Sequence, residues 1–79
     1  MNIIFYTKRG CPWCDEAREF LNHKGLPYEE REVLANKAFF DELVEKSGQT
    51  KTPTFDVDGE IVSDSSAKEF EEYLNQKLK

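Results

Sequence analysis

Two cysteines separated by two residues are the most reactive side chains in this sequence. They stand in the run Cys11-Pro12-Trp13-Cys14, and Pro12 favours the first position of a helix. A cysteine at a helix N-terminus lies beside unpaired backbone N–H groups and the positive end of the helix dipole, and both favour a thiolate. We therefore expect Cys11 to attack a disulfide and Cys14, one turn later, to resolve the mixed disulfide.

Charged residues near the pair act in both directions. Lys8 and Arg9 precede it and would stabilise a thiolate, whereas acidic residues at 15 and 16 suit the helix dipole but oppose a thiolate. Lys8 and Lys51 are either ordinary solvated charges or ligands for a substrate carboxylate. Both interpretations stay open at this point.

The same cysteines would also make half of a zinc site. Structural zinc takes four protein ligands, but the chain has no second cysteine pair, and its one histidine, His23, is placed like a surface residue near a helix end. We therefore favour redox chemistry and expect no metal.

Trp13 and Pro53 each allow two interpretations. Trp13 is either an exposed lid that shapes substrate access or a core aromatic at helical spacing with Ala17 and Phe20. Pro53 begins an apolar strand, where it is either preceded by a cis bond or lies on a sheet edge.

The surrounding pattern predicts alternating strands and helices. We expect strands at 2–6 and 28–33, a helix at 12–24, and a second helix between an N-cap at Asn36 and a stop at Gly48. Residues 54–57 and 60–62 read as a hairpin around Asp58-Gly59, and Ser66 with Glu69 forms a capping box for the last helix. The order is βαβαββα, with parallel pairing between the early strands and antiparallel pairing in the hairpin.

Length and charge limit the remaining possibilities. A chain of 79 residues makes one domain, residues 1–79, and its 38% hydrophobic content suffices for one core, so we expect a folded monomer. A net charge of -5 argues against nucleic acid or anionic membrane as partners. We find neither a leader pattern nor a long apolar run, and closely spaced cysteines fit a reducing compartment, so we expect a cytoplasmic protein.

The ordered motifs resemble those of the glutaredoxin family over essentially the whole chain. The resemblance rests on the cysteine motif ten residues in, together with Ile4-Phe5-Tyr6-Thr7-Lys8, Gly25-Leu26-Pro27-Tyr28, Gly48-Gln49 and Pro53-Thr54-Phe55. It implies an α/β thioredoxin fold, in which a four-stranded mixed sheet is flanked by three helices.

The resemblance also implies a binding site. It places a cis bond before Pro53 close to Cys11, gives the backbone of Thr52 the role of pairing with a bound peptide, and matches Lys8 to a lysine that meets the glycine carboxylate of glutathione. The expected substrate- and glutathione-binding residues are Lys8, Pro12, Trp13, Lys51, Thr52, Pro53, Ser63, Asp64 and Ser65. Glutathione is the expected reductant or co-substrate, with no tightly bound cofactor.

Two departures from the family pattern affect the γ-glutamyl end of glutathione. Lys51-Thr52 stands where the family usually has Thr-Val, and Val62-Ser63 stands where it has a Gly-Gly pair. The Asp that commonly follows that pair in the family aligns with Ser66 of this chain. Asp64 and Ser65 are the candidates to compensate.

The resemblance therefore predicts a glutathione-dependent dithiol oxidoreductase that reduces protein disulfides or glutathione mixed disulfides. One alternative keeps both cysteines but takes electrons from a thioredoxin reductase. A less favoured alternative is an iron-sulfur carrier with Cys11 from two protomers and glutathione as ligands, because Pro12 stiffens the loop and Cys14 offers a competing disulfide.

Overall fold

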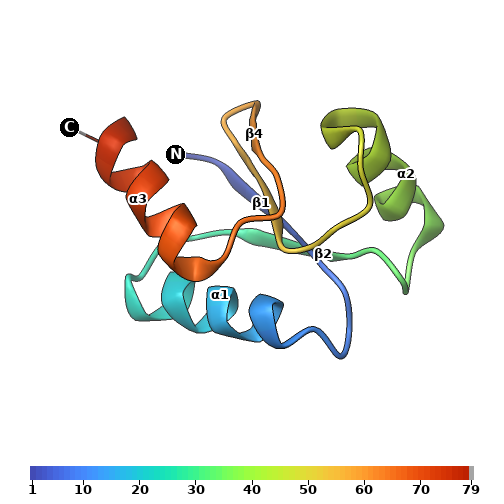
Figure 1. Ribbon diagram of the computed structural model, residues 1–79, viewed down its shortest axis with the longest axis horizontal. Coiled ribbons are helices and arrows are strands. Elements are labelled where there is room, and N and C mark those ends of the chain that lie inside the picture. The colour runs from blue at the N-terminus through green and yellow to red at the C-terminus, as the bar shows by residue number, and fades with distance from the viewer. Residues whose placement is uncertain (79) are drawn as a thin grey trace.

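One mixed β-sheet forms the centre of the protein in a computed structural model that describes residues 1–78 (Figure 1). Its strand order is β2-β1-β3-β4. The central strand β1 (Ile3–Thr7) pairs in parallel with β2 (Glu29–Glu32) and antiparallel with β3 (Thr54–Val57), which forms a hairpin with β4 (Glu60–Val62). The predicted order and the mixed sheet are confirmed.

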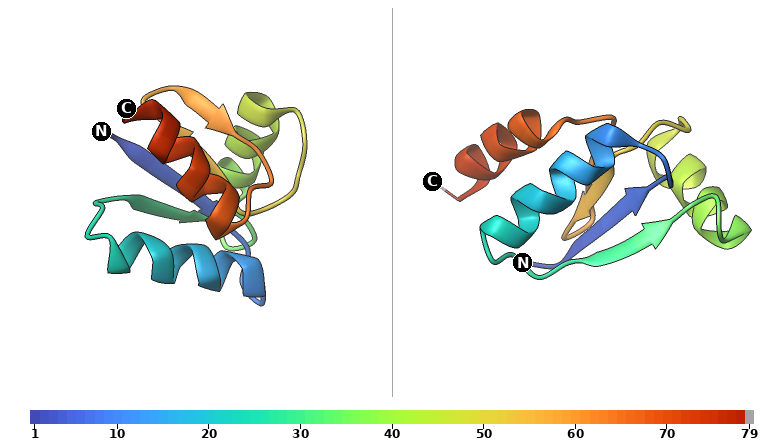
Figure 2. Two further views of the ribbon diagram at one scale, coloured as in Figure 1. Left: turned by 60° about the vertical axis from the view of Figure 1, so that its left-hand side comes forward. Right: turned by 90° about the horizontal axis from the view of Figure 1, so that it is seen from below.

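Three helices cover the two faces of this sheet. Helix α1 (Pro12–His23) and helix α3 (Ala67–Lys77) lie side by side on one face, and helix α2 (Lys37–Ser47) packs on the other (Figure 2). Side chains alternate along β1, so Phe5 faces α1 and α3 while Tyr6 faces α2. The three helices and the sheet make the α/β thioredoxin fold.

A stack of aromatic rings forms the core under α1 and α3. Phe5, Phe55 and Phe70 are fully buried, and the ring centroids lie 5.1 Å apart for Phe5 and Phe55 and 3.8 Å apart for Phe55 and Phe70. Each buried aromatic contributes about 1.5–3 kcal/mol of hydrophobic stabilisation. This core fixes the position of α1, whose first turn carries the cysteines.

The face under α2 combines apolar packing with a polar network. Tyr6 is buried beside Leu43, and its hydroxyl donates to Glu42 at 2.8 Å and accepts from Lys46 at 2.9 Å. Lys46 also bonds the buried carboxylate of Asp56 on β3 at 2.8 Å. Burial raises the pKa of Tyr6, so the phenol stays neutral and joins α2 to the sheet.

Element boundaries differ from the predicted ones by one or two residues. Strand β1 extends to Thr7, helix α1 ends one residue early at His23, and Gly25 follows with a φ of 66°. Strand β2 is one residue shorter at each end than the predicted 28–33, and the ring of Tyr28 packs edge-on against Phe5 with the centroids 5.8 Å apart. None of these differences moves the cysteine motif.

Within residues 1–78, the helices are all too short and too polar to cross a lipid bilayer.

Candidate active site

Cys11 occupies the N-cap of α1, as its position before Pro12 predicts. Its backbone is extended, with a φ of -103°, and its Sγ accepts a hydrogen bond from the backbone N–H of Cys14 at 3.2 Å. The thiol is only partly buried. Sulfur at this position faces the positive end of the helix and remains open to an incoming disulfide.

Cys14 lies one turn inside the helix and has a different environment. Its side chain is fully buried, and desolvation, followed by the hydrogen bond to Cys11, raises the pKa of Cys14 from 9.0 to about 11. Both cysteines are free thiols in this structure. At neutral pH, Cys14 therefore remains a protonated thiol within one helical turn of Cys11.

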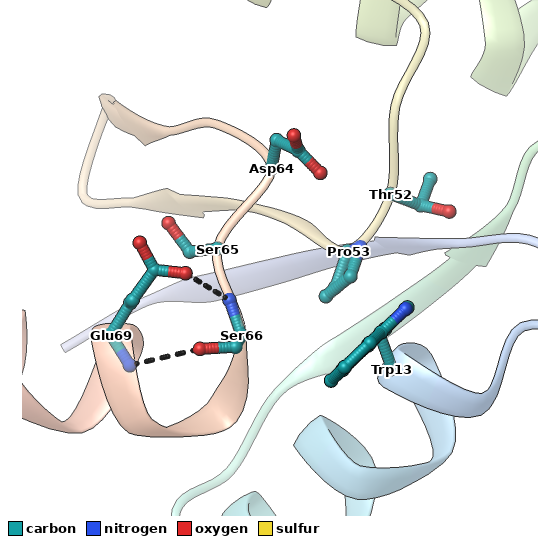
Figure 3. Close-up of a pocket in the computed structure, with 7 residues that line it drawn as sticks. All are labelled: Trp13, Thr52, Pro53, Asp64, Ser65, Ser66 and Glu69. Atoms are coloured by element: carbon teal, nitrogen blue, oxygen red, sulfur yellow. Dashed lines mark hydrogen bonds between the residues drawn. The ribbon is translucent and has the colours of Figure 1, made fainter.

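Trp13 projects out of α1 and is 60% exposed. It therefore takes the exposed position of the two that its sequence context allowed. The buried positions of the helix are filled by Cys14, Ala17 and Leu21 instead. Figure 3 shows the indole at one side of a cavity, below Pro53.

The Thr52–Pro53 peptide bond is cis, which confirms the expectation from the family resemblance and excludes the alternative of a plain edge-strand proline. The cis bond lies at the start of β3, the strand next to β1 in the sheet interior. Thr52 approaches the reactive sulfur, with its Oγ1 3.8 Å from Sγ of Cys11. A substrate sulfur bonded to Cys11 would therefore contact Thr52.

A cavity of about 210 Å³ opens beside these residues (Figure 3). We call it the Trp13 groove. It is lined by Trp13, Thr52, Pro53, Asp64, Ser65, Ser66 and Glu69. The groove lies beside the reactive sulfur, because Thr52, which lines it, contacts Cys11 across 41 residues of sequence.

The other expected binding residues lie around the groove rather than in it. Lys8 is partly buried just before the cysteine loop, and Pro12 is the first residue of α1. Lys51 is exposed, with its Nζ 3.9 Å from a carboxylate oxygen of Asp64. Ser63 is exposed, and its carbonyl accepts from the Ser65 hydroxyl at 3.2 Å. None of these four residues lines the cavity.

Residue 64 shows where the chain turns towards α3. Asp64 has a φ of 49°, the left-handed region that glycine adopts most easily. The Gly-Gly pair of the family pattern had been placed on Val62-Ser63, but Val62 belongs to β4. The left-handed backbone conformation that favours glycine is therefore found at Asp64, one residue after the Val62-Ser63 pair that was aligned with Gly-Gly.

Two residues that line the groove, and a third outside it, escaped the sequence-based site prediction. Ser66 and Glu69 line the groove as well as capping α3, with Ser66 N–H donating to the Glu69 carboxylate at 3.1 Å and Glu69 N–H to the Ser66 hydroxyl at 3.3 Å. Their capping box signal was visible in the sequence, although it does not report a cavity. Thr54, which contacts loops on both sides of the groove, carried no signal.

The part of the chain that the structure describes holds no group of three or more His, Cys, Asp or Glu side chains placed to bind a metal ion. The two cysteines contact each other and Thr52 instead.

Comparison with known proteins assigns this chain, with its paired-cysteine site, to a family. The family model described as Glutaredoxin matches residues 3–62, which include the cysteine loop and the cis-proline loop. The chain belongs to the glutaredoxin family. As a family member it is a thiol-disulfide oxidoreductase.

Individual relatives agree with this assignment. Glutaredoxin 3 of Escherichia coli (strain K12) is 34% identical over 61 residues, covering 77% of this chain and 74% of that protein. The N-acetyl-S-hydroxy-L-cysteine reductase of Bacillus subtilis (strain 168) is 32% identical over 57 residues, covering 72% of this chain and 61% of that protein.

Solved structures extend the comparison. The thioredoxin-like protein BC3987 has 33% sequence identity and a TM-score of 0.81, covering 89% of this chain and 96% of that one. A buckwheat glutaredoxin-glutathione complex has 19% identity and a TM-score of 0.73, covering 96% of this chain and 71% of that one. At this identity, the similarity shows only that the two proteins share a fold.

Proposed function

We propose that this glutaredoxin reduces protein disulfides and glutathione mixed disulfides, with Cys11 as the attacking thiolate, Cys14 as the resolving thiol and glutathione as reductant. The observation that carries the assignment of roles is the difference in exposure between the two thiols, partly open for Cys11 and closed for Cys14. Only Cys11 is open to the sulfur of a large substrate.

The reaction proceeds through two thiol-disulfide exchanges. The Cys11 thiolate attacks one sulfur of the substrate disulfide, forming a mixed disulfide, and the departing substrate thiolate takes up a proton. Cys14 then attacks Sγ of Cys11, releases the second substrate sulfur and loses its proton, which balances the charge of that departing thiolate. The product is a Cys11–Cys14 disulfide and a reduced substrate dithiol.

The buried position of Cys14 suits this order of events. Its raised pKa keeps it protonated at neutral pH, so it does not compete with Cys11 for the incoming disulfide. Two molecules of glutathione then return the enzyme to its dithiol form and leave as glutathione disulfide.

Basic side chains beside the groove support glutathione as the reductant. Lys8 is available for one carboxylate of the tripeptide, and Lys51 for another once it leaves Asp64, while Trp13 offers a flat apolar surface along the groove. Proteins of this fold include a buckwheat glutaredoxin in complex with glutathione.

A thioredoxin reductase is the second candidate for the electron donor, and one ion pair favours it. Asp64 lies 3.9 Å from Lys51 and adds a negative charge where an anionic tripeptide would bind.

A coupled assay separates the two donors. We expect the reduced protein to sustain NADPH oxidation with a disulfide-bonded peptide when glutathione and glutathione reductase are supplied, and not when thioredoxin reductase alone is supplied. The reverse result would assign the second donor, and no turnover with either would reject both.

We further propose that residues 1–79 act as one monomeric domain in the cytoplasm. The paired cysteines fit a reducing compartment, and the acidic net charge of -5 disfavours nucleic acid and anionic membranes as partners.

A further inference from the structure

Thr54 is a buried residue whose hydroxyl uses its full hydrogen-bonding capacity. It is 1% exposed at the start of β3. Its Oγ1 donates to the backbone carbonyl of Lys51 at 2.8 Å and accepts from Nε2 of Gln49 and from the backbone N–H of Asp64, both at 3.2 Å. One donor and two acceptor positions are all that a hydroxyl has.

The partners of Thr54 belong to the two opposite sides of the Trp13 groove. Gln49 and Lys51 lie in the loop that leads to Thr52 and Pro53, whereas Asp64 begins the segment that continues to Ser65. Figure 3 shows Thr52 and Pro53 on one side of the groove and Asp64 to Ser66 on the other. We call these sides the Thr52 wall, formed by the loop 49–53, and the Asp64 wall, formed by residues 64–66. Thr54 follows the Thr52 wall directly in the chain, and its hydroxyl bonds to both walls.

Two other contacts join the walls. The N–H of Ser65 donates to the carbonyl of Pro53 at 3.0 Å, and the exposed side chains of Lys51 and Asp64 approach to 3.9 Å. An exposed pair at this distance restrains little, because solvent screens it. The buried Thr54 hydroxyl is therefore the main side-chain restraint on the separation of the walls.

We propose that Thr54 is a positioning residue that holds the Thr52 and Asp64 walls at the separation needed to bind the disulfide substrate. This inference rests on the proposed function, in which substrate occupies the Trp13 groove. Thr54 does not touch the groove or the sulfur atoms, so it affects substrate affinity and leaves the chemistry of Cys11 unchanged.

Removal of the hydroxyl would loosen both walls at once. The Lys51 carbonyl and the Asp64 N–H would each lose a partner next to a buried side chain, and both segments would shift to recover one. Cys11 is held separately, by the first turn of α1 and its bond from the Cys14 N–H.

The test compares Thr54→Val, which keeps the shape and removes the hydroxyl, with Thr54→Ser, which keeps it. Each protein is reduced with dithiothreitol, freed of reductant and mixed with increasing concentrations of a disulfide-bonded peptide. For Thr54→Val, which removes all three hydrogen bonds of the hydroxyl, we expect the half-saturating concentration to rise on the order of tenfold, with the limiting rate kept. Thr54→Ser should behave like the unaltered protein.

Two further measurements separate positioning from general destabilisation. The rate of Cys11 alkylation by iodoacetamide should stay the same in Thr54→Val. Thr7→Val is the matched control, because Thr7 is equally buried and its hydroxyl donates to Glu30 at 3.0 Å, away from both walls. It should lower stability without changing half-saturation.

An unchanged half-saturating concentration in Thr54→Val, or an equal rise in Thr7→Val, would overturn the proposal. If Thr54→Val does not fold, Gln49→Ala removes one of the three partners, and the same criterion applies to it. Failure of the unaltered protein to reduce the peptide would reject the proposed function instead.

Discussion

Individual cysteines one helical turn apart acquire different properties because only one of them is buried. The N-cap position leaves Cys11 partly open, and the next turn places Cys14 among core side chains such as Phe5 and Ala17. The difference in exposure thus separates the proposed roles of two chemically identical side chains.

Replacement of each cysteine should produce different losses. Cys11→Ser should abolish all disulfide reduction, since no other exposed thiol remains. Cys14→Ser should lose reduction of protein disulfides but keep exchange with a glutathionylated peptide, which needs one thiol. Turnover of both substrates by each variant checks this, and equal losses would contradict separate roles.

The buried Cys14 thiol should also make stability depend on alkaline pH. The pKa of Cys14 is about 11 in the folded protein, above the ordinary value of 9.0, so the unfolded chain releases this proton first. The stabilising contribution is complete below about pH 9 and disappears as the pH rises to about 11. It amounts to about 2–3 kcal/mol.

Denaturant titrations of the unaltered protein and Cys14→Ser, at several pH values across this range, measure the contribution. The comparison is needed because burial also raises the pKa of Tyr6, which weakens the fold at alkaline pH in the same direction. A constant stability difference between the two proteins from pH 8 to pH 11 would contradict the prediction.

Charge at Asp64 should affect binding of an anionic thiol. In Asp64→Gly the backbone keeps its conformation at no steric cost, and Lys51 becomes free for a carboxylate. We expect the half-saturating glutathione concentration to fall roughly two- to fivefold, the range of an exposed ion pair. Asp58→Gly is the matched control, since Asp58 has a φ of 53° but lies in the β3–β4 turn.

Single residues differ in how far the sequence predicts their roles. Cys11 and Cys14 are recognisable from their spacing, because the helix that positions them is encoded locally by Pro12 and the residues that follow. Thr54 has no local signal, since its three partners come from residues 49, 51 and 64, which meet only after the hairpin forms. The exposed side chain of Trp13 was also undecided until its helix was packed.

Among the secondary-structure elements, helix starts were the best predicted. Asn36 accepts from the Ala38 N–H at 2.9 Å, and Ser66 with Glu69 forms the expected capping box. Strand β2 was less well predicted, because its Glu and Arg side chains give no apolar alternation. Its place in the sheet is set by backbone pairing with β1.

The two capped helices provide a test that separates stability from function. Asn36→Ala and Ser66→Ala should each cost about 1 kcal/mol of unfolding free energy, as a lost N-cap usually does. Only Ser66 lines the Trp13 groove, so only Ser66→Ala should weaken binding of the disulfide-bonded peptide. Equal binding by both variants would remove the α3 N-terminus from the substrate site.

On the scale of the whole molecule, the sheet separates an aromatic core from a polar network. The stack of Phe5, Phe55 and Phe70 joins β1, β3 and α3, whereas Tyr6 and Asp56 on the opposite face bond to α2. The alternation of β1 predicts two faces. The hydrogen-bond partners on the second face are set by how α2 packs.

Truncation of Phe70, the ring that α3 adds to the aromatic stack, should threaten the entire fold. We expect Phe70→Ala to cost about 3–5 kcal/mol, because a large cavity would open beside Phe55. The total free energy of unfolding of a small domain is about 5–15 kcal/mol. Phe20→Ala is the control, since Phe20 is only partly buried and its centroid lies 6.4 Å from Phe70. Urea unfolding should show a much smaller loss of unfolding free energy for Phe20→Ala than for Phe70→Ala.

Strand β2 forms one border of the sheet, where a row of backbone groups is open to further pairing. Its residues are Glu29, Glu30, Arg31 and Glu32, whose long charged side chains flank that row. An open strand edge of this kind can add a strand from another chain and so start β-aggregation. The charged border makes this addition costly, so the reactive face of the protein can meet other chains while its sheet edge resists pairing with them.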